Sequence, residues 1–320
     1  MSGVDVVDVP AVVRARARAA GDPGWADRLP RLLTDLEQAW SLEVTGVLTG
    51  GTASVVVRAV AADGRPVVVK AAVPGTGSAR QVHTLLRAAG NGYVQVLAHA
   101  PEHEAVLLEA LGTSLAASGL PPGEQLVRLA RLVRRAWQVA PSVAAGEPED
   151  KAAGLAALVS RLWHELDRPC PEPVVEEALA CAARRAADFD PSGCVVVHGD
   201  AAPANAARVL DPRPGTEDGF VLLDPDGFVG DPTYDLGVAV RDWCPQLLTS
   251  RSPADLLDGW CETVAGVAGV DPAVVWDWGF LERVSTGLFV LSLGGRDQAR
   301  PFLRTAEVLL AAGSRWRVLR

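Results

Sequence analysis

The sequence lacks the features that would assign this 320-residue chain to a membrane, secreted or disulfide-rich class. No uninterrupted apolar run reaches membrane-spanning length, and the first residues carry acids where a secretory signal has a basic head and an apolar middle. The five cysteines are odd in number and form no C-x-x-C pair, so neither a disulfide framework nor a zinc site is indicated. We therefore expect a cytoplasmic protein without a membrane partner.

Basic side chains, and lysine in particular, are also scarce. Acidic residues outnumber Lys and Arg by 39 to 30, and the formal net charge of −9 argues against a nucleic-acid partner, because phosphate backbones are bound by basic patches. Only Lys70 and Lys151 are lysines. With 49% apolar residues, the chain can form one large globular domain or two lobes with separate cores.

The hydrophobic pattern changes near Gly112. Before it, helical patterns cover 10–40, with a break at Pro30, and 78–89, and strand patterns cover 42–48, 53–61, 66–72, 93–100 and 105–111. After it, helical patterns cover 124–139, 151–167, 174–188, 232–243, 253–267, 272–293 and 305–312. The sequence therefore predicts an α+β fold, with a small antiparallel sheet in domain 1–112 and a mostly helical domain 113–320.

Two short strand patterns interrupt the helical region, and both end in acids. In "VVVHGDAAPAN", Asp200 precedes Asn205 by five positions, so one loop presents a carboxylate and an amide oxygen. This pair suits phosphoryl transfer, in which a carboxylate orients the attacking hydroxyl and an amide helps to hold Mg²⁺. The alternative is a plain turn in which Asp200 caps a short helix.

The second acidic strand end strengthens this interpretation. In "FVLLDPDG", Asp224 follows a buried strand and Asp226 comes two residues later. Carboxylate oxygens at a strand end are the ligands that Mg²⁺ needs beside nucleotide phosphates. For Asp226, an ordinary Asp-Gly turn is an equally good explanation.

Two features of the first domain point to phosphate binding. Lys70 ends the strand "PVVVK" in a chain that almost always uses arginine, and a lysine ammonium can reach nucleotide phosphates. The loop "TGVLTGGTAS" contains Gly50 and Gly51, which allow backbone N–H groups to approach a phosphate. The same glycines could form a simple hairpin turn.

These motifs, in this order, resemble the aminoglycoside phosphotransferase family, in particular its streptomycin 6-phosphotransferase and hydroxyurea kinase branch. The resemblance implies a bilobal protein-kinase-like fold with a nucleotide-binding lobe at 1–112 and an acceptor-binding lobe at 113–320. It also implies ATP or GTP as phosphate donor and Mg²⁺ as cofactor. The implied roles are catalytic base (Asp200), metal ligands (Asn205, Asp224), phosphate contact (Lys70), hinge to the nucleotide base (Glu109, Leu111) and support of the catalytic loop (His198, Asp235).

The sequence departs from the family pattern at two places. Relatives carry a glutamate on the helix after the lysine strand. In this sequence, residues 75–101, which include that helix, contain no acid. Gln81 is a possible neutral partner of Lys70, or Lys70 contacts only Asp224 and the phosphates. The catalytic loop is also unusually rich in alanine, although its Asp and Asn are present.

The acceptor is expected to be a cation. Residues 231–282 contain nine acids and only two arginines, and a guanidino or amino antibiotic would be held by such a surface. Asp242, Asp277 and Glu282 are the candidate contacts, although a solvated helical face is the alternative for most of these acids. Trp276 and Trp278 flank Asp277 and either stack on the acceptor or anchor a helix.

The leading hypothesis is therefore an ATP- and Mg²⁺-dependent kinase that phosphorylates a hydroxyl of a streptomycin-type aminoglycoside and gives antibiotic resistance. A second hypothesis keeps the chemistry but takes hydroxyurea, a tuberactinomycin-type peptide or another small metabolite as acceptor. A third is a catalytically weak, nucleotide-binding regulatory protein. The chain is expected to be a monomer or dimer, which the sequence does not distinguish.

Overall fold

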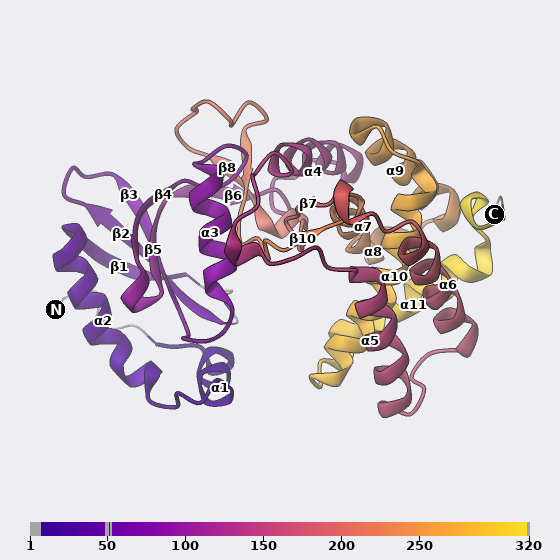
Figure 1. Ribbon diagram of the computed structural model, residues 1–320, viewed down its shortest axis with the longest axis horizontal. Coiled ribbons are helices and arrows are strands. Elements are labelled where there is room, and N and C mark those ends of the chain that lie inside the picture. The colour runs from indigo at the N-terminus through magenta and orange to yellow at the C-terminus, as the bar shows by residue number, and fades with distance from the viewer. Residues whose placement is uncertain (1–7, 49–50, 52, 319–320) are drawn as a thin grey trace. The chain divides into compact units, whose positions relative to one another are not determined.

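The computed structural model describes residues 8–48, 51 and 53–318 (Figure 1). The chain forms two compact units, one from residues 1–112 and 208–219 and the other from residues 113–207 and 220–320. No helix in the described part of the chain is long and apolar enough to cross a membrane.

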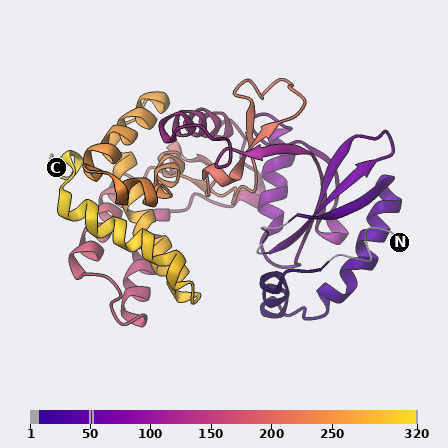
Figure 2. The same ribbon diagram turned by 180° about the vertical axis from the view of Figure 1, so that it is seen from behind.

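The first unit is built on a five-stranded antiparallel sheet of order β1-β2-β3-β5-β4. Its strands are β1 (Leu42–Leu48), β2 (Ser54–Ala61), β3 (Pro66–Ala72), β4 (Val96–Ala100) and β5 (Ala105–Glu109), and its helices are α1 (Ala11–Ala19), α2 (Trp25–Trp40), α3 (Ser78–Ala88) and the 3₁₀ turn η2 (Pro101–His103). Figures 1 and 2 show the sheet lying between α2 and α3. The predicted strands 42–48, 53–61 and 66–72 and the predicted helix 78–89 are confirmed. β4 begins three residues after the predicted start at 93, and the predicted strand 105–111 ends at Glu109.

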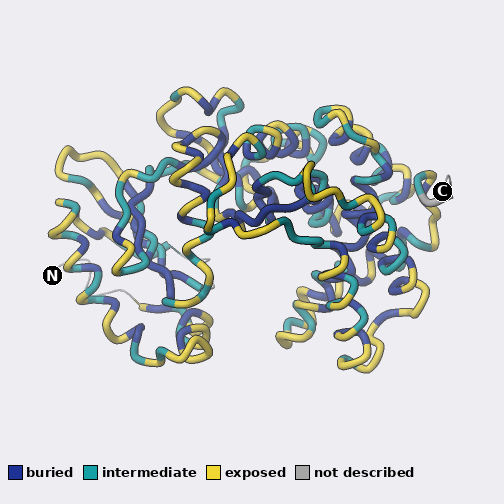
Figure 3. The backbone as a smooth tube through the Cα atoms, viewed as in Figure 1, coloured by how far each residue is buried: buried dark blue, intermediate teal, exposed yellow. Residues whose placement is uncertain are grey.

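One face of the sheet forms the core of the first unit. Val67, Val69 and Ala71 of β3 are buried with residues of α1 and α2, and Figure 3 shows the central strands in the colour of buried residues. Because side chains alternate along a strand, Lys70 belongs to the opposite face, the one that α3 covers. The apolar pattern of "PVVVK" thus determines the direction of the lysine.

The predicted break of the first helix at Pro30 is wrong. The helices separate at Gly21, whose φ of +83° ends α1, and Pro30 is the sixth residue of α2. A proline near the start of a helix removes only one backbone hydrogen bond, and the hydroxyl of Thr34 donates to the Pro30 carbonyl at 3.1 Å. The same arrangement explains why α11 begins nine residues before the predicted 305, since Pro301 is its sixth residue.

The second unit is mostly helical, as predicted. Its helices are α4 (Pro122–Ala136), α5 (Lys151–Glu165), α6 (Glu172–Ala187), α7 (Thr233–Arg241), α8 (Cys244–Thr249), α9 (Pro253–Ala268), α10 (Pro272–Ser292), α11 (Arg296–Ala312) and α12 (Arg315–Val318), with short 3₁₀ turns η3 (Val143–Ala145), η4 (Pro191–Gly193) and η5 (Pro203–Asn205). The short helix α8 was not expected, because six residues give no clear helical period.

Short strands of the second half of the chain carry the two acidic loops. A two-stranded sheet pairs β7 (Val195–Val196) with β10 (Val229–Gly230), and a three-stranded sheet has the order β6-β8-β9 (Leu111–Ser114, Ala206–Val209, Phe220–Leu222). α7 and α10 pack so closely that a Cβ at Gly237 would lie 2.1 Å from the Cβ of Trp278. Of the three candidate acceptor acids, Asp277 and Glu282 lie in α10, and Asp242 directly follows α7. Trp276 and Trp278 of α10 are buried, so they anchor this helix in the core.

Candidate active site

A buried carboxylate on α7 supports the loop that carries Asp200. Asp235 is fully buried, and its oxygens accept the N–H groups of His198 at 2.9 Å and Gly199 at 2.8 Å. The indole N–H of Trp137 adds a third hydrogen bond at 3.0 Å. Burial raises the pKa of Asp235, while His198 and the two backbone donors oppose that rise. The first residues of the Asp200 loop are therefore fixed to helix α7.

Gly199 lies at the tightest point of this loop. Its φ is +88°, a conformation that L side chains rarely adopt, and a Cβ here would lie 2.6 Å from the Cβ of Asp226. Glycine is required at this position because the catalytic loop passes directly against the "DPDG" loop. The close approach brings the two acidic strand ends of the sequence to one place.

His198 connects the two loops through both ring nitrogens. Its Nδ1 accepts the backbone N–H of Asp200 at 3.1 Å, and its Nε2 lies 2.7 Å from the carbonyl oxygen of Leu223. These contacts fit an imidazole that carries its proton on Nε2. The Leu223 N–H in turn donates to the Asn205 carbonyl at 2.8 Å. The residue before Asp224 is therefore bonded to both ends of the catalytic loop.

Asn205 and Asp224 present oxygen atoms at this junction. The Asn205 side chain donates from Nδ2 to the Asp200 carbonyl at 2.9 Å and to Asp200 Oδ2 at 2.8 Å, which leaves Oδ1 as the atom that a metal ion could bind. Asp224 is exposed and has a φ of +53°, a strained conformation for a residue other than glycine. Backbone strain of this kind is concentrated at functional sites.

This donor set fits Mg²⁺ held together with nucleotide phosphates. Among the described residues, no group of three or more His, Cys, Asp or Glu side chains forms a complete metal cage. Mg²⁺ commonly takes only one or two protein carboxylates and completes its shell with water and phosphate oxygens. Asn205 and Asp224 match that pattern. Burial and the nearby Asp200 carboxylate raise the pKa of Asp226, as expected for an acid crowded by another acid.

Arg241, at the end of α7, contacts three carboxylates and was not singled out from the sequence. Its Nη2 lies 3.0 Å from Asp200 Oδ1, its Nε 2.7 Å from Asp242 Oδ1, and its Nη1 3.1 Å from Glu282 Oε2. Burial lowers its pKa, but the three carboxylates outweigh that effect and raise it well above the usual value. An isolated arginine in an acidic segment was the available sequence signal.

The three predicted acceptor contacts lie in different environments. Asp242 is partly exposed beside Arg241, whereas Glu282 is buried and accepts the Tyr234 hydroxyl at 2.6 Å. Asp277 is 2% exposed, and its oxygens accept from Arg184 at 2.7 Å and Arg185 at 3.2 Å. Asp277 therefore joins α10 to α6, and its burial gives no support to the predicted acceptor contact.

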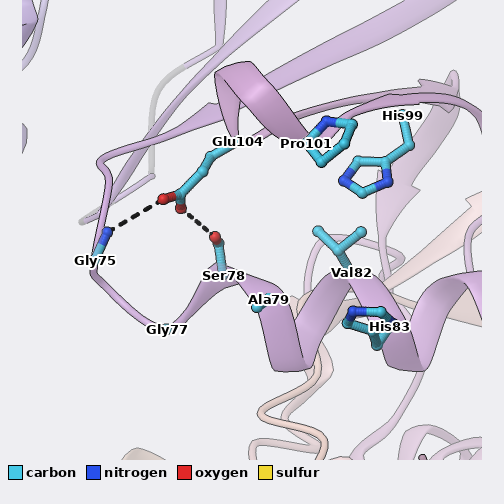
Figure 4. A pocket seen from close by; sticks show the side chains of 9 residues that line it. All are labelled: Gly75, Gly77, Ser78, Ala79, Val82, His83, His99, Pro101 and Glu104. Carbon is cyan, nitrogen blue, oxygen red and sulfur yellow. Dashed lines mark hydrogen bonds between the residues drawn. The ribbon is translucent and has the colours of Figure 1, made fainter. Parts of the chain in front are cut away.

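In the first unit, Lys70 has a neutral partner. Its Nζ donates to Gln81 Oε1 at 2.7 Å, so the glutamine of α3 is a neutral partner of Lys70, as the sequence suggested. Glu104 positions the start of α3, because its carboxylate accepts the Ser78 hydroxyl at 2.5 Å and the Gly75 N–H at 3.3 Å (Figure 4). The β4-β5 hairpin thus orients the helix that carries Gln81.

The predicted hinge lies at the end of β5. The carboxylate of Glu109 accepts the Gln95 N–H at 2.8 Å and pairs with Arg213, and the Glu109 N–H donates to the Gln95 carbonyl at 3.1 Å. Leu111, the second predicted hinge residue, begins β6. Arg213 also explains why residues 208–219 belong to the first unit. Of the predicted glycine loop, Gly51 is partly exposed and Gly50 lies outside the described residues.

An antiparallel-sheet unit, a helical unit and two joined acidic loops define a bilobal α+β protein of the protein-kinase-like fold. The two loops carry the carboxylate and amide groups that kinases use in transferring phosphate to an alcohol group. Residues 39–292 match the family described as "Aminoglycoside/hydroxyurea antibiotic resistance kinase", and the chain belongs to this family. The resemblance and the fold class predicted from the sequence are confirmed.

Relatives and solved structures agree with this assignment. The chain is 24% identical over 299 residues to a streptomycin 6-kinase of Streptomyces glaucescens, which covers 92% of this chain and 94% of that protein. It is 27% identical over 313 residues to a hydroxyurea phosphotransferase of Kitasatospora aureofaciens, covering 95% and 86%. The choline kinase LicA from Streptococcus pneumoniae has the same fold, with a TM-score of 0.57, 16% identity and coverage of 88% and 100%.

Proposed function

We propose that this chain transfers the terminal phosphate of ATP to a hydroxyl of a cationic, streptomycin-type aminoglycoside and thereby confers antibiotic resistance. In this proposal the nucleotide-binding residues lie in domain 1–112, and the base, the metal ligands and the acceptor-binding residues lie in domain 113–320. The streptomycin 6-kinase relatives and the acidic segment 231–282 support the choice of acceptor.

The observation that carries the proposal is the way Asp200 is held. Its side chain is 44% exposed, yet each carboxylate oxygen has a fixed donor, Arg241 Nη2 on Oδ1 at 3.0 Å and Asn205 Nδ2 on Oδ2 at 2.8 Å. An accessible carboxylate fixed from two sides is ready to receive a proton without reorganising. A carboxylate that only capped a turn would need neither donor.

In the proposed reaction, Asp200 orients the acceptor hydroxyl and accepts its proton. The hydroxyl oxygen forms a bond to the terminal phosphorus, the bond from that phosphorus to the bridging oxygen breaks, and ADP leaves. Lys70 contacts the phosphates, and the Glu109 carbonyl and Leu111 contact the nucleotide base. Mg²⁺, held by Asn205 and Asp224 together with the phosphates, would neutralise charge on the transferring group.

The test is ADP release with ATP, Mg²⁺ and a panel of streptomycin, hydroxyurea and a tuberactinomycin peptide. Asp200→Asn should lower acceptor-dependent turnover by about 10²- to 10⁴-fold, the usual contribution of a general base, while nucleotide binding is retained. The matched control is Asp255→Asn, because Asp255 is an exposed acid of the same acidic segment. Turnover of hydroxyurea but not of streptomycin would identify hydroxyurea as the acceptor. Nucleotide binding without turnover of any acceptor would contradict the kinase function.

A further inference from the structure

Arg283 of α10 is a buried cation that the proposed reaction does not use. Its side chain is fully buried, and no described carboxylate lies within ion-pair distance of its guanidinium. Burial lowers the pKa of Arg283, and the groups that chiefly oppose this fall are the thiols of Cys244 and Cys261, with Asp242 contributing less. Burying a cation without a paired anion is costly, so helix packing alone would favour an apolar side chain here.

The hydrogen bonds of this guanidinium to oxygen end on helix carbonyls. Its Nη2 donates to the Val240 carbonyl of α7 at 2.8 Å, and its Nη1 donates to the Gly279 carbonyl of its own helix at 3.4 Å. Its Nε has no partner among the described residues. Because the bond to Val240 is the shorter of the two, the main contact of the Arg283 side chain is with α7.

The Val240 carbonyl lies in the last turn of α7. Carbonyls of a last helical turn have no N–H partner inside their helix, and cations are favoured there because this end of the helix dipole is negative. The buried indole of Trp243 donates to the Ala239 carbonyl at 2.9 Å, and Arg283 donates to the next carbonyl, that of Val240. Two buried side chains therefore fix the last turn of α7, which ends at Arg241.

Arg241 is the residue whose backbone these contacts hold. The carbonyls on either side of its Cα are those of Val240, which accepts from Arg283, and of Arg241 itself, which accepts from the Cys244 thiol at 3.8 Å. Fixing both peptide groups restricts the direction in which the Arg241 side chain leaves the helix. That side chain places its Nη2 3.0 Å from Asp200 Oδ1.

We infer that Arg283 is a positioning residue, which fixes the end of α7 through the Val240 carbonyl and thereby sets the place of Arg241 beside Asp200. The inference rests on the proposed function, because Asp200 is the base of that reaction. A residue that only capped a helix would act on folding alone, whereas Arg283 acts on the rate of phosphate transfer through Arg241. The two roles give different results when Arg241 is replaced as well.

The first test is the kcat of Arg283 variants with an acceptor that the parent protein phosphorylates. Arg283→Met removes the donor to Val240 and keeps a long side chain. We expect kcat to fall about 10-fold, because a small displacement of a catalytic group is enough to slow the reaction. KM for ATP should stay within about twofold of the parent. Arg283→Lys keeps a donor for the carbonyl and should lose no more than about threefold in kcat.

A double-mutant cycle with Arg241→Met then shows through which residue Arg283 acts. The protein that carries both replacements should have a kcat within about twofold of Arg241→Met alone, since the contact that Arg283 supports is already lost. A further loss of about 10-fold, as for independent effects, would overturn the inference, and so would an unchanged kcat in Arg283→Met. If Arg283→Met does not fold, Arg283→Gln takes its place, because its amide is polar but shorter than the arginine side chain.

The control is Val284→Ala, since Val284 is the next residue of α10 and is fully buried. It should lower the free energy of unfolding, because it leaves a cavity, and keep kcat within about twofold of the parent. If Val284→Ala lost as much kcat as Arg283→Met, any weakening of α10 would have this effect and the inference would be wrong.

Urea denaturation distinguishes failure of the inference from failure of the proposed function, because it needs no turnover. In the same cycle, the double variant should lose less free energy of unfolding than the two single variants lose together. This result in a protein that phosphorylates no acceptor would support the link between Arg283 and Arg241 and contradict the kinase function. Additive losses in such a protein would overturn the inference.

Discussion

The two compact units hold their principal charged side chains in different ways. In the first unit, Lys70 donates to the neutral amide of Gln81 at 2.7 Å. In the second, Asp200 is paired with the guanidinium of Arg241, which also binds Asp242 and Glu282. One unit positions a charge with a neutral partner, and the other shares one cation among three anions.

This difference fits the ligand expected at each place. The amide of Gln81 is neutral, so this hydrogen bond orients the Lys70 ammonium without cancelling its charge. Three carboxylates close together repel one another, and a guanidinium with donors on several edges reduces that repulsion while fixing each of them. A lysine that binds an anion and a carboxylate base are thus positioned by partners of different charge.

Among the variants that test this difference between the units, loss of the shared Arg241 guanidinium should have the largest effect. Arg241→Met leaves Glu282 buried without its guanidinium and Asp200 held by Asn205 alone. Losing one partner of a buried ion pair costs about 3–5 kcal/mol, which urea denaturation would measure as a lower free energy of unfolding. A misplaced base should also reduce kcat by up to about 10²-fold, with KM for ATP little changed.

The control for this variant is Arg161→Met, because Arg161 makes an ion pair with Glu165 in which both side chains are more than half exposed. Exposed pairs contribute about 0–1 kcal/mol, so Arg161→Met should leave both stability and kcat near the parent values. If both arginine variants lost a similar amount of stability, the sharing of Arg241 among three carboxylates would contribute no more to stability than an exposed ion pair does.

Changing the partner of Lys70 should have a smaller effect. Gln81→Leu removes one hydrogen bond to a charged group, and KM for ATP should rise by about 3- to 10-fold with kcat less affected. Gln81→Glu restores a charged acceptor and should keep KM within about threefold of the parent. Lys70→Met removes the ammonium itself, so its KM for ATP gives the largest rise expected from the Lys70–Gln81 pair. If Gln81→Leu left KM for ATP unchanged, the amide would have no part in positioning Lys70.

The fold could be predicted from sequence wherever one period dominated a long stretch. Alternating apolar residues located β2 and β3 within one residue, because the sheet has one buried face. The errors came from Pro30 and Pro301, which sequence rules treat as helix breakers. At the sixth residue of a helix, a proline costs one hydrogen bond, and tertiary packing supplies more than that loss.

The candidate site could be predicted only as far as its loops are contiguous in sequence. Asp200, Asn205 and Asp224 lie in two short segments at strand ends, and such segments are recognisable. Arg241 lies at the end of α7, distant in sequence from the catalytic loop, so only the packed fold shows that it contacts Asp200. The burial of Asp277 was also not visible, since an acid in a helix is usually solvated.

The smallest predicted effect is a pH dependence that differs between the units. Burial, together with the nearby charge of His83, lowers the pKa of His99 below its usual 6.5. Folding then favours the neutral ring, so this contribution to stability is complete above pH 6.5 and is lost as the pH falls through the lower folded value. Burial raises the pKa of Asp235 above 3.8, and its contribution is lost as the pH rises through the raised value.

A fall in pH should therefore lower the stability of the first unit, because His99 becomes protonated, and raise that of the second unit, because Asp235 becomes protonated. His99→Gln should make the melting temperature fall less as the pH drops below 6.5, by no more than about 2 °C because His99 is only partly buried. His164→Gln, at an exposed histidine of α5, is the control and should keep the parent profile. If His99→Gln and His164→Gln had the same pH profile, then the His83–His99 pair would not contribute to acid sensitivity. The opposite response of the two units would then rest on Asp235 alone.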